Sequence, residues 1–316
     1  MKAAIVTAAG QAPRSGDFRA PVPQEGQLQI AVTAAALSPL TKGRAAGSHY
    51  SSQAVYPFVA GVDGVGTYQG ARVYFVMPEA PFGAMAEQVC MVPERCVMLP
   101  DALDDVTAAA IANPGMSSWA ALKRRAKLQA GETVLINGAT GIAGRLAVQI
   151  AKHLGAKKVI ATGRNPASLK ELAALGADVV VPLTQDDATV HEAFKEQFSA
   201  GVDVVLDYLW GPSAASLLVA AAKAGKDGVP MRFVQIGASS GADITLPGAV
   251  LRSSAITLMG SGIGSVSMAH LLRAIEELLQ AAQPAGFQIN TRNLPLAQVE
   301  QAWGNDNSAV RTVFTI

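Results

Sequence analysis

A glycine-rich turn between an apolar run and a helical pattern constrains this 316-residue chain more than any other feature. The run Val134-Leu135-Ile136 is typical of a buried strand. After the turn, Leu146, Ile150 and Leu154 repeat at helical spacing. A second apolar run, Val159-Ile160-Ala161, follows. Strand, glycine turn, helix and strand within about thirty residues form the βαβ unit of a dinucleotide-binding fold.

The turn has the residues that a bound pyrophosphate requires. We expect Gly138 and Gly141 to adopt the backbone angles of a sharp reversal, and Gly144 to let the helix pack closely on the strand. The free N–H groups and the dipole at the start of the helix attract phosphate. The pattern has an alanine where the commonest fingerprint has its first glycine. The candidate cofactor-binding residues of the turn are Gly138, Ala139, Thr140, Gly141, Ile142, Ala143 and Gly144.

Composition excludes several classes of protein. Half of the residues are hydrophobic, so large cores are available, and the net charge of +1 gives no argument for nucleic acid or an anionic membrane. No apolar run is long enough to span a bilayer, and the first residues are typical of a strand rather than a secretory signal. Two cysteines, Cys90 and Cys96, provide no disulfide framework. We therefore expect a cytoplasmic protein.

The chain falls into a mostly β part followed by an alternating α/β part. In the first, strands are expected at 2–6, 27–33, 72–76 and 85–92, and the glycine-rich segment 62–68 suggests a strand that other backbone approaches closely. A helix at 101–112 is expected to end at Asn113-Pro114-Gly115, before another at 117–125.

From residue 133 onward, strand and helix patterns alternate, which predicts a doubly wound parallel sheet. The expected strands are 133–137, 158–162, 178–181, 203–207, 231–237 and 256–260, and the expected helices are 141–154, 166–175, 186–199, 211–224 and 248–254. A helix at 267–282, a strand near 287–291, a helix at 295–302 and a strand at 310–316 complete the chain. The final strands lack helical partners of their own, so we expect them to return to the first domain.

Four segments give the whole chain a resemblance to the medium-chain dehydrogenase/reductase superfamily, in its zinc-independent quinone oxidoreductase branch. They are Gly61-Val62-Asp63-Gly64-Val65-Gly66, the run from Asn113 to Leu122, the run from Gly131 to Gly141, and Leu175-Gly176-Ala177-Asp178. The resemblance implies a GroES-like catalytic domain at 1–117, completed by 255–316, and a Rossmann cofactor domain at 118–254. It also implies a homodimer in which the edge strand at 256–260 pairs with its twin.

The resemblance also allows the zinc-ligand positions of the zinc-dependent relatives to be compared with this sequence. Structural zinc requires four close cysteines, and the chain has two. The catalytic ligand positions of the zinc-dependent relatives are occupied here by Leu37-Ser38-Pro39-Leu40-Thr41 and by Val62-Asp63. We therefore expect no metal. Without a Lewis acid, oxidation of an alcohol is harder to support. Transfer of hydride to an activated alkene or a quinone is easier, because conjugation delocalises the developing charge.

The candidate catalytic residues are Ser38, Thr41 and Tyr50. The branch's usual Asn-Pro-x-Asp segment corresponds to Ser38-Pro39-Leu40-Thr41, so hydroxyls replace its amide and carboxylate. Ser38 and Thr41 either donate hydrogen bonds to substrate or cap a turn. Lys42 and Arg44 either stabilise an enolate-like oxygen or are solvated surface cations. Tyr50 either protonates the product or forms an aromatic wall of the pocket.

The end of the second strand of the βαβ unit points to NADPH. The segment Thr162-Gly163-Arg164-Asn165 has no carboxylate for a ribose diol, whereas Arg164 can bind a 2′-phosphate and Asn165 can hydrogen-bond to it. Lys170 is an alternative phosphate ligand, and Gly237, at the end of the strand expected at 231–237, is a further cofactor candidate.

The sequence leaves three functions open. The first is an NADPH-dependent oxidoreductase that transfers hydride to a quinone or an α,β-unsaturated carbonyl without zinc. The second is an enoyl thioester reductase, which would favour a basic entrance for the phosphates of coenzyme A. The third is a non-catalytic NADPH-binding protein with a structural or sensing role. The substrate in the first two cases is a small molecule, with neither nucleic acid nor membrane as a partner.

Overall fold

The computed structural model describes residues 1–49, 52, 55–305 and 307–316. The chain forms two compact units: the first comprises Met1–Asn113 and Leu272–Ile316, and the second comprises Pro114–Leu271. The domain limits expected from the sequence, at 117/118 and 254/255, stay a prediction. Within the described ranges, no helix combines the length and the apolar character needed to cross a membrane.

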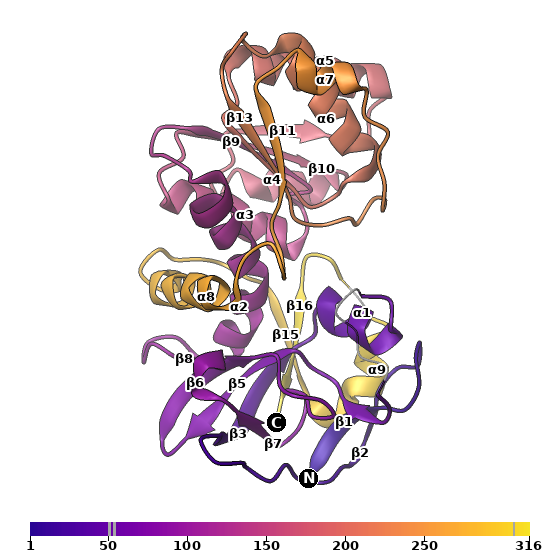
Figure 1. The fold of residues 1–316 in the computed structure, drawn as a ribbon, viewed down its shortest axis with the longest axis vertical. Coiled ribbons are helices and arrows are strands. Elements are labelled where there is room, and N and C mark those ends of the chain that lie inside the picture. Colours follow the sequence, from indigo (N-terminus) through magenta and orange to yellow (C-terminus); the bar gives the residue numbers. More distant parts are fainter. Residues whose placement is uncertain (50–51, 53–54, 306) are drawn as a thin grey trace. The chain divides into compact units, whose positions relative to one another are not determined.

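The second unit is built around a parallel sheet. In the described part of the chain it has six strands in the order β11-β10-β9-β12-β13-β14, and all neighbouring pairs are parallel. The strands are β9 (Thr133–Asn137), β10 (Lys158–Gly163), β11 (Val179–Pro182), β12 (Val204–Asp207), β13 (Met231–Gln235) and β14 (Ile256–Gly260). The helices are α3 (Ile142–His153), α4 (Pro166–Leu172), α5 (Asp187–Ala200), α6 (Gly211–Ala224) and α7 (Gly248–Arg252). Figure 1 shows α5, α6 and α7 on one side of this sheet and α3 on the other, which confirms the predicted doubly wound sheet.

The strand order reverses beside β9, because β10 and β12 pair with its two edges. Asn137 and Asp207, the last residues of β9 and β12, are partners in the register of this pair. Ligands of open α/β sheets bind outside the carboxyl ends of the strands at such a reversal. The topology therefore places a candidate ligand site at Asn137 and Asp207.

The first unit contains two sheets. Within the described residues, one has seven strands, in the order β15-β16-β3-β5-β6-β8 with β7 paired to β3, and the other has three, in the order β2-β1-β4. The strands are β1 (Lys2–Val6), β2 (Arg14–Asp17), β3 (Leu28–Ala36), β4 (Phe58–Val59), β5 (Asp63–Tyr68), β6 (Ala71–Val76), β7 (Gln88–Met91), β8 (Cys96–Met98), β15 (Thr291–Pro295) and β16 (Arg311–Thr315). The remaining helical elements, which do not alternate with strands of the parallel sheet, are α1 (Pro39–Ala46), η1 (Pro93–Arg95), α2 (Asp105–Ala120), η2 (Ala121–Ala126), α8 (Met268–Ala282), η3 (Leu296–Gln298) and α9 (Val299–Trp303). Because β15 and β16 join β3, the predicted return of the last strands to the first domain is confirmed.

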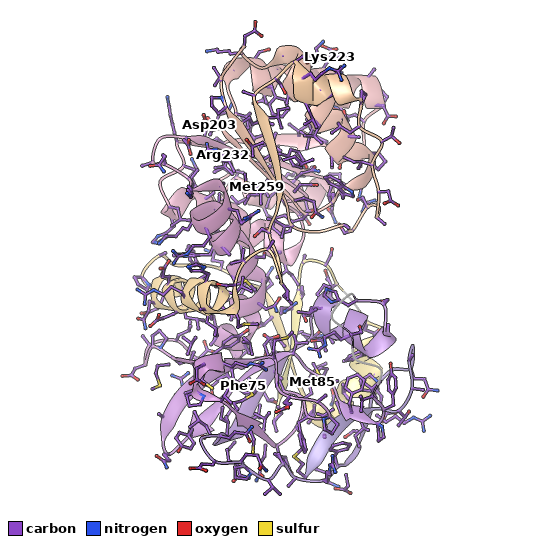
Figure 2. All side chains as sticks on the ribbon, viewed as in Figure 1. Phe75, Met85, Asp203, Lys223, Arg232 and Met259 are labelled. Atoms are coloured by element: carbon purple, nitrogen blue, oxygen red, sulfur yellow. The ribbon has the colours of Figure 1, made fainter. Side chains whose placement is uncertain are left out.

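The glycines of β5 admit close neighbours, as the sequence predicts. A Cβ atom on Gly66 would lie 2.3 Å from the carbonyl oxygen of Ala31, and one on Gly64 would lie 2.9 Å from the ring of Phe75. Phe75 and Met85 are fully buried in the core cluster of this unit, and Figure 2 marks their positions. The two glycines thus allow β5 to lie tightly against β3 and that core.

The prediction that Asn113-Pro114-Gly115 separates two helices is wrong. α2 continues through Pro114 to Ala120, and a π-helical turn, η2, follows. Proline removes one N–H donor from a helix, and packing of the surrounding segment can keep the helix continuous. Here Ser117 Oγ donates to the Pro114 carbonyl at 2.6 Å, and Ser118 Oγ donates to the Gly115 carbonyl at 3.0 Å.

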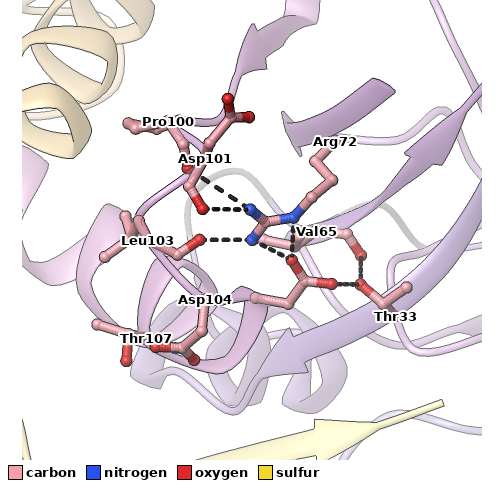
Figure 3. Close-up of polar contacts among 9 residues, drawn as sticks. Thr33, Val65, Arg72, Pro100, Asp101, Leu103, Asp104 and Thr107 are labelled. Atoms are coloured by element: carbon pink, nitrogen blue, oxygen red, sulfur yellow. Dashed lines mark hydrogen bonds and ion pairs between the residues drawn. The ribbon is translucent and has the colours of Figure 1, made fainter. Parts of the chain in front are cut away.

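An ion pair fixes the start of α2 to the seven-stranded sheet. The Nε atom of Arg72, on β6, donates to Asp105 Oδ1 at 2.8 Å, and Thr33 Oγ1, on β3, donates to Asp105 Oδ2 at 2.6 Å (Figure 3). The Arg72 guanidinium also donates to the carbonyl of Leu103, in the turn before α2. We regard this cluster as structural, because all of its charges and hydroxyls are occupied by one another.

The strand expected near 287–291 begins later, because the residues before it close a helix. Gly286 has a φ of +65°, and the Phe287 N–H bonds back to the carbonyl of Ala282, at the end of α8, at 2.9 Å. Pairing with β16 starts at Thr291, opposite Arg311. The apolar Phe287 therefore belongs to the helix terminus, although its hydrophobicity suggests a strand.

Candidate functional site

The glycine turn of the second unit has the close packing that the sequence predicts. Gly138 has a φ of +91°, and a Cβ atom there would lie 2.8 Å from the side chain of Leu209. A Cβ atom on Gly144 would lie 2.3 Å from the carbonyl oxygen of Gly138. A side chain on Gly144 would clash with the backbone of the turn, and one on Gly138 would be strained by the positive φ. These two glycines therefore determine the shape of the turn.

Gly141 has a different role from the one expected of its backbone. It caps α3 with φ −79° and ψ 167°, a conformation open to any residue, so the expected need for unusual angles is wrong at this position. The first helical bond of α3 runs from Arg145 N to Gly141 O at 2.9 Å. Glycine has no side chain, so Gly141 cannot cap the N–H groups of Ile142, Ala143 and Gly144. The absence of a Cβ leaves room for an anion near these donors.

A buried polar chain supports the turn from below. Asn137 Nδ2 donates to Asp207 Oδ1 at 2.8 Å, and Thr162 Oγ1 donates to Asn137 Oδ1 at 2.7 Å. Thr162 Oγ1 also accepts the N–H of Gly138 at 3.1 Å. Asn137, Thr162 and Asp207 are fully buried, so these bonds link three strands at the reversal of strand order. The carboxylate of Asp207 thereby controls the position of Gly138 through two intermediaries.

Asp207 also holds the loop that follows β12. Its carboxylate accepts the N–H groups of Leu209 and Trp210, at 3.1 Å for each of the shortest contacts. Trp210 has a φ of +56°, a strained conformation for an aromatic residue. Burial raises the pKa of Asp207, while its bonds to Asn137, Leu209 and Trp210 lower it. Asp207 thus holds a strained residue directly after β12, at the carboxyl edge of the sheet.

Gly237 and Tyr208 lie on the same side of the sheet. A Cβ atom on Gly237 would lie 2.8 Å from the carbonyl oxygen of Tyr208, so the glycine permits close contact between the loops after β12 and β13. The Tyr208 hydroxyl lies 3.4 Å from Ser117 Oγ, and burial raises the pKa of Tyr208 to about 12. Tyr208 is therefore a neutral group, suited to shaping the site rather than to proton transfer at neutral pH.

The end of β10 presents Arg164 to solvent. Among the described residues, Arg164 has no ion-pair or hydrogen-bond partner, and its side chain is exposed. Asn165 uses Oδ1 to accept the N–H groups of Ala167 and Ser168, so this oxygen caps α4 and only the amide NH₂ is available to a ligand. A Cβ atom on Gly163 would lie 2.3 Å from the side chain of Thr140, so Thr140 packs against the strand just before Arg164. Lys170 is exposed on α4.

In the first unit, Ser38 and Thr41 form a buried hydroxyl pair at the start of α1. Ser38 Oγ accepts the N–H of Thr41 at 2.9 Å and lies 2.9 Å from Thr41 Oγ1. The two side chains are 1% and 2% exposed. The expected turn cap is therefore present, as a helix N-cap. The cap does not exclude a catalytic role, because Thr41 also lines a hollow.

This hollow lies within the first unit and opens to solvent. Its lining is apolar apart from Thr41 and Arg44, and includes Phe58, Val59, Val62 and Phe82. Arg44 is half-buried, whereas the ammonium of Lys42 lies 5.9 Å from the centre of the Trp303 ring. The structure thus separates the two cations, and Arg44 is the one at the hollow. Tyr50, the expected proton donor, lies outside the described residues.

The described residues contain no cluster of three or more His, Cys, Asp or Glu side chains that could hold a metal ion. Cys90 and Cys96 are both half-buried free thiols, and burial raises the pKa of each. The expectation that the protein works without zinc stays a prediction, which elemental analysis of the purified protein can check.

Comparison with known proteins agrees with this architecture. Residues 143–281 match the family of zinc-binding dehydrogenases. A probable NADPH-dependent quinone reductase of Emericella nidulans is 28% identical and covers 91% of both chains. The quinone oxidoreductase of Thermus thermophilus, solved also with NADPH, is 26% identical, covers all of both chains and has a TM-score of 0.82. The chain belongs to the medium-chain dehydrogenase/reductase superfamily, in its quinone oxidoreductase-like branch.

As a member of this superfamily, the chain has the expected Rossmann and GroES-like folds. A more distant likeness links it to a trans-enoyl reductase of Aspergillus terreus, which is 29% identical over 50% of this chain and 41% of the relative. Sequence reasoning missed Asp207, Thr162 and Gly163 as supports of the cofactor turn. The available signal was a polar residue at the end of each of three buried strands, at the edge where α/β folds bind ligands.

Proposed function

We propose that this protein is an NADPH-dependent oxidoreductase that reduces quinones or α,β-unsaturated carbonyl compounds without zinc. The observation that carries the cofactor choice is Arg164, exposed at the end of β10 in a segment without a carboxylate. A guanidinium binds a 2′-phosphate, whereas an NAD-specific site has an acidic residue for the ribose diol. The relative from Emericella nidulans, which covers most of the chain, supports the same choice.

The residues present fit this cofactor. The pyrophosphate would bind at the start of α3, on the N–H groups of Ile142 and Ala143, with Gly141 leaving space for it. Arg164 and the amide of Asn165 would hold the 2′-phosphate, and Thr140 would lie between the two phosphate sites. When bound, NADPH supplies the hydride.

The hydroxyl pair of α1 is the proposed hydrogen-bond donor to the substrate carbonyl. Because Ser38 Oγ accepts the Thr41 N–H, its own proton is free to point to Thr41 Oγ1. The Thr41 proton is then free to point into the hollow, toward an oxygen that becomes negative as hydride arrives. Ser38 acts in this proposal by orienting Thr41. Tyr50 remains the proposed proton donor to the product.

A second candidate is enoyl thioester reduction, favoured by the likeness to the trans-enoyl reductase. The same residues serve both reactions, because each substrate has an alkene conjugated to a carbonyl. A third possibility, a non-catalytic NADPH-binding protein, differs by binding NADPH without consuming it. A panel of quinones, enones and enoyl thioesters, followed by NADPH absorbance, separates all three.

Substitution of Arg164 tests the cofactor assignment directly. A charge-assisted hydrogen bond contributes roughly 1.5–3 kcal/mol, so Arg164→Ala should lower NADPH affinity about 10- to 150-fold and leave NADH affinity nearly unchanged. Lys157→Ala is the matched control, because Lys157 is an exposed cation before the opposite end of β10. Titration of both cofactors into each variant gives the affinity ratio. An unchanged ratio in Arg164→Ala would refute the assignment and direct attention to Lys170.

We also propose a homodimer that forms through β14. This strand is the last in the parallel sheet of the described chain, and Leu258 on it is 38% exposed. An apolar edge strand without a partner is prone to pair with another chain. Leu258→Lys should shift the mass measured by light scattering toward the monomer. A monomeric mass for the unaltered protein at micromolar concentration would contradict the proposal.

A further inference from the structure

Arg44 has surroundings that a purely structural arginine rarely has. It lies in the last turn of α1, and among the described residues that line the hollow it is the one with a formal charge. Its guanidinium is half-buried, and its described hydrogen bond runs from Nη1 to the sulfur of Met77, at 3.4 Å. A thioether is a weak acceptor and carries no charge. The positive charge is therefore partly desolvated, and no described residue supplies an anion to compensate it.

Met77 is itself held in place. It has a φ of +53°, its N–H donates to the Val62 carbonyl at 2.6 Å, and its carbonyl accepts from Arg95 Nη1 at 2.6 Å. The weak contact with Met77 occupies one N–H of the Arg44 guanidinium, and among the described residues no other side-chain hydrogen bond of Arg44 occurs. A guanidinium whose donors meet no described carboxylate is suited to bidentate binding of a planar anion.

The acidic residues nearby do not neutralise this charge. Glu79, between the lining residues Pro78 and Ala80, is exposed and makes no ion pair with Arg44. Residues 50, 51, 53 and 54, which follow α1 in the sequence, include no Asp or Glu. Burial lowers the pKa of Arg44, and no carboxylate opposes this shift. Burial also lowers the pKa of His49, and the positive charge of Arg44 lowers it further. His49 is thus biased toward its neutral form, and the hollow keeps the charge of one arginine.

We infer that the hollow binds the carboxylate of an anionic substrate, held by the Arg44 guanidinium among apolar and aromatic side chains, while Thr41 stays with the substrate carbonyl. The inference rests on the proposed function and sharpens its substrate class: conjugated electrophiles that carry a carboxylate, rather than neutral quinones or enones. Phe58 and Phe82 in the lining favour an aromatic or extended apolar body next to that carboxylate.

Direct binding tests this inference without cofactor or turnover. Benzoate and benzamide have nearly the same shape, so calorimetric titration of each into the full-length protein isolates the effect of charge. Benzoate should bind about 10- to 100-fold more tightly than benzamide, and the ratio should fall as salt is raised. Arg44→Gln should bring the ratio close to one, whereas Arg44→Lys, which keeps the charge but loses the fork, should retain part of it.

Lys42→Gln is the matched control, because Lys42 lies on the same helix but over Trp303, and its ratio should equal that of the unaltered protein. Equal affinity for the two probes in the unaltered protein, or an unchanged ratio in Arg44→Gln, would overturn the inference and leave Arg44 as a cation that only stabilises the end of α1.

Turnover provides the second measurement. The kcat/KM for 3-benzoylacrylate should exceed that for 3-benzoylacrylamide about tenfold or more, and Arg44→Gln should remove the difference. If neither compound nor any neutral quinone consumes NADPH, the proposed function fails, while the benzoate titration still decides the inference. If neutral quinones react and benzoate shows no preference, the inference alone fails.

Discussion

Asp63 in the first unit and Asp207 in the second are both buried carboxylates beside candidate sites, but their hydrogen bonding differs. Asp207 accepts from Asn137 Nδ2 and from the N–H groups of Leu209 and Trp210. Asp63 accepts from the Tyr74 hydroxyl at 2.8 Å, and its Oδ1 has no hydrogen-bond partner among the described residues. Burial raises the pKa of Asp63 to about 6, against the lowering effects of Arg311 and Tyr74.

The comparison separates two uses of a buried charge. Several donors converge on Asp207, so its carboxylate organises the cofactor turn and the strained Trp210. Few donors reach Asp63, so its negative charge is costly above its pKa and is compensated mainly through the nearby Arg311 and Tyr74. Removal of the side chain should therefore harm the protein at Asp207, whereas removal of the charge alone should help it at Asp63.

The largest effect is expected from Asp207→Ala. It leaves one N–H of the Asn137 amide, whose other bond runs to Ser213, and two backbone N–H groups without their acceptor, and each buried unsatisfied group costs about 1–3 kcal/mol. Part of that is offset by loss of the buried charge, so we expect destabilisation of about 2–4 kcal/mol and weaker cofactor binding. Chemical denaturation and cofactor titration measure the two effects. Asp207→Asn keeps one acceptor oxygen and should cost clearly less; equal costs for both variants would show that the hydrogen bonds at Asp207 are unimportant.

Asp63→Asn should produce the next effect, and it should depend on pH. The folded pKa of Asp63, about 6, lies above the ordinary value of 3.8, so the folded state binds the extra proton between these values. The contribution of Asp63 to the free energy of unfolding is fully present below pH 4. It is lost as the pH rises through 6, and the loss amounts to at most about 3 kcal/mol.

Asp63→Asn cannot ionise and should lack this loss. The difference in unfolding free energy between variant and unaltered protein should therefore shift in favour of the variant between pH 4 and 7. A difference that is constant over this range would contradict the raised pKa. Comparison of the two proteins at each pH cancels the contributions of the other carboxylates.

Tyr74→Phe is expected to give the smallest effect, about 1 kcal/mol at neutral pH, because it removes one hydrogen bond to Asp63. Without that donor, ionised Asp63 is less stable, so the pH window in which stability is lost should move upward. The midpoint of this window, measured as for Asp63→Asn, distinguishes the two outcomes. An unchanged midpoint would mean that Tyr74 does not affect the ionisation of Asp63, which would then depend on burial and Arg311.

The fold was largely predictable because its signals are local. The alternation of apolar runs and helical patterns after Thr133 identified the strands of the parallel sheet, and the spacing of Gly138 and Gly144 identified the turn. α2 is the main exception. The rule that proline ends a helix is also local, but the burial of the segment around Pro114 overrides it.

The candidate site was less predictable, because its contacts join distant parts of the chain. Asn137 and Asp207 are 70 residues apart and meet only when β9 and β12 pair. The sequence gives Lys42 and Arg44 equal claims to the substrate. The structure distinguishes them, since Lys42 lies over Trp303 and Arg44 lines the hollow.

The sequence alone determined the βαβ unit, the absence of a carboxylate beside Arg164, and the two hydroxyls of Ser38 and Thr41 around a proline. These are statements about residue type and short-range spacing, which the backbone geometry of a turn or strand makes specific. The tertiary structure alone decided that Asp207 supports the turn, that Asp63 lacks a full set of donors, and that Arg44 is desolvated without a described counter-ion. Burial and pairing depend on which distant segments come together, and one residue's neighbours in sequence do not specify them.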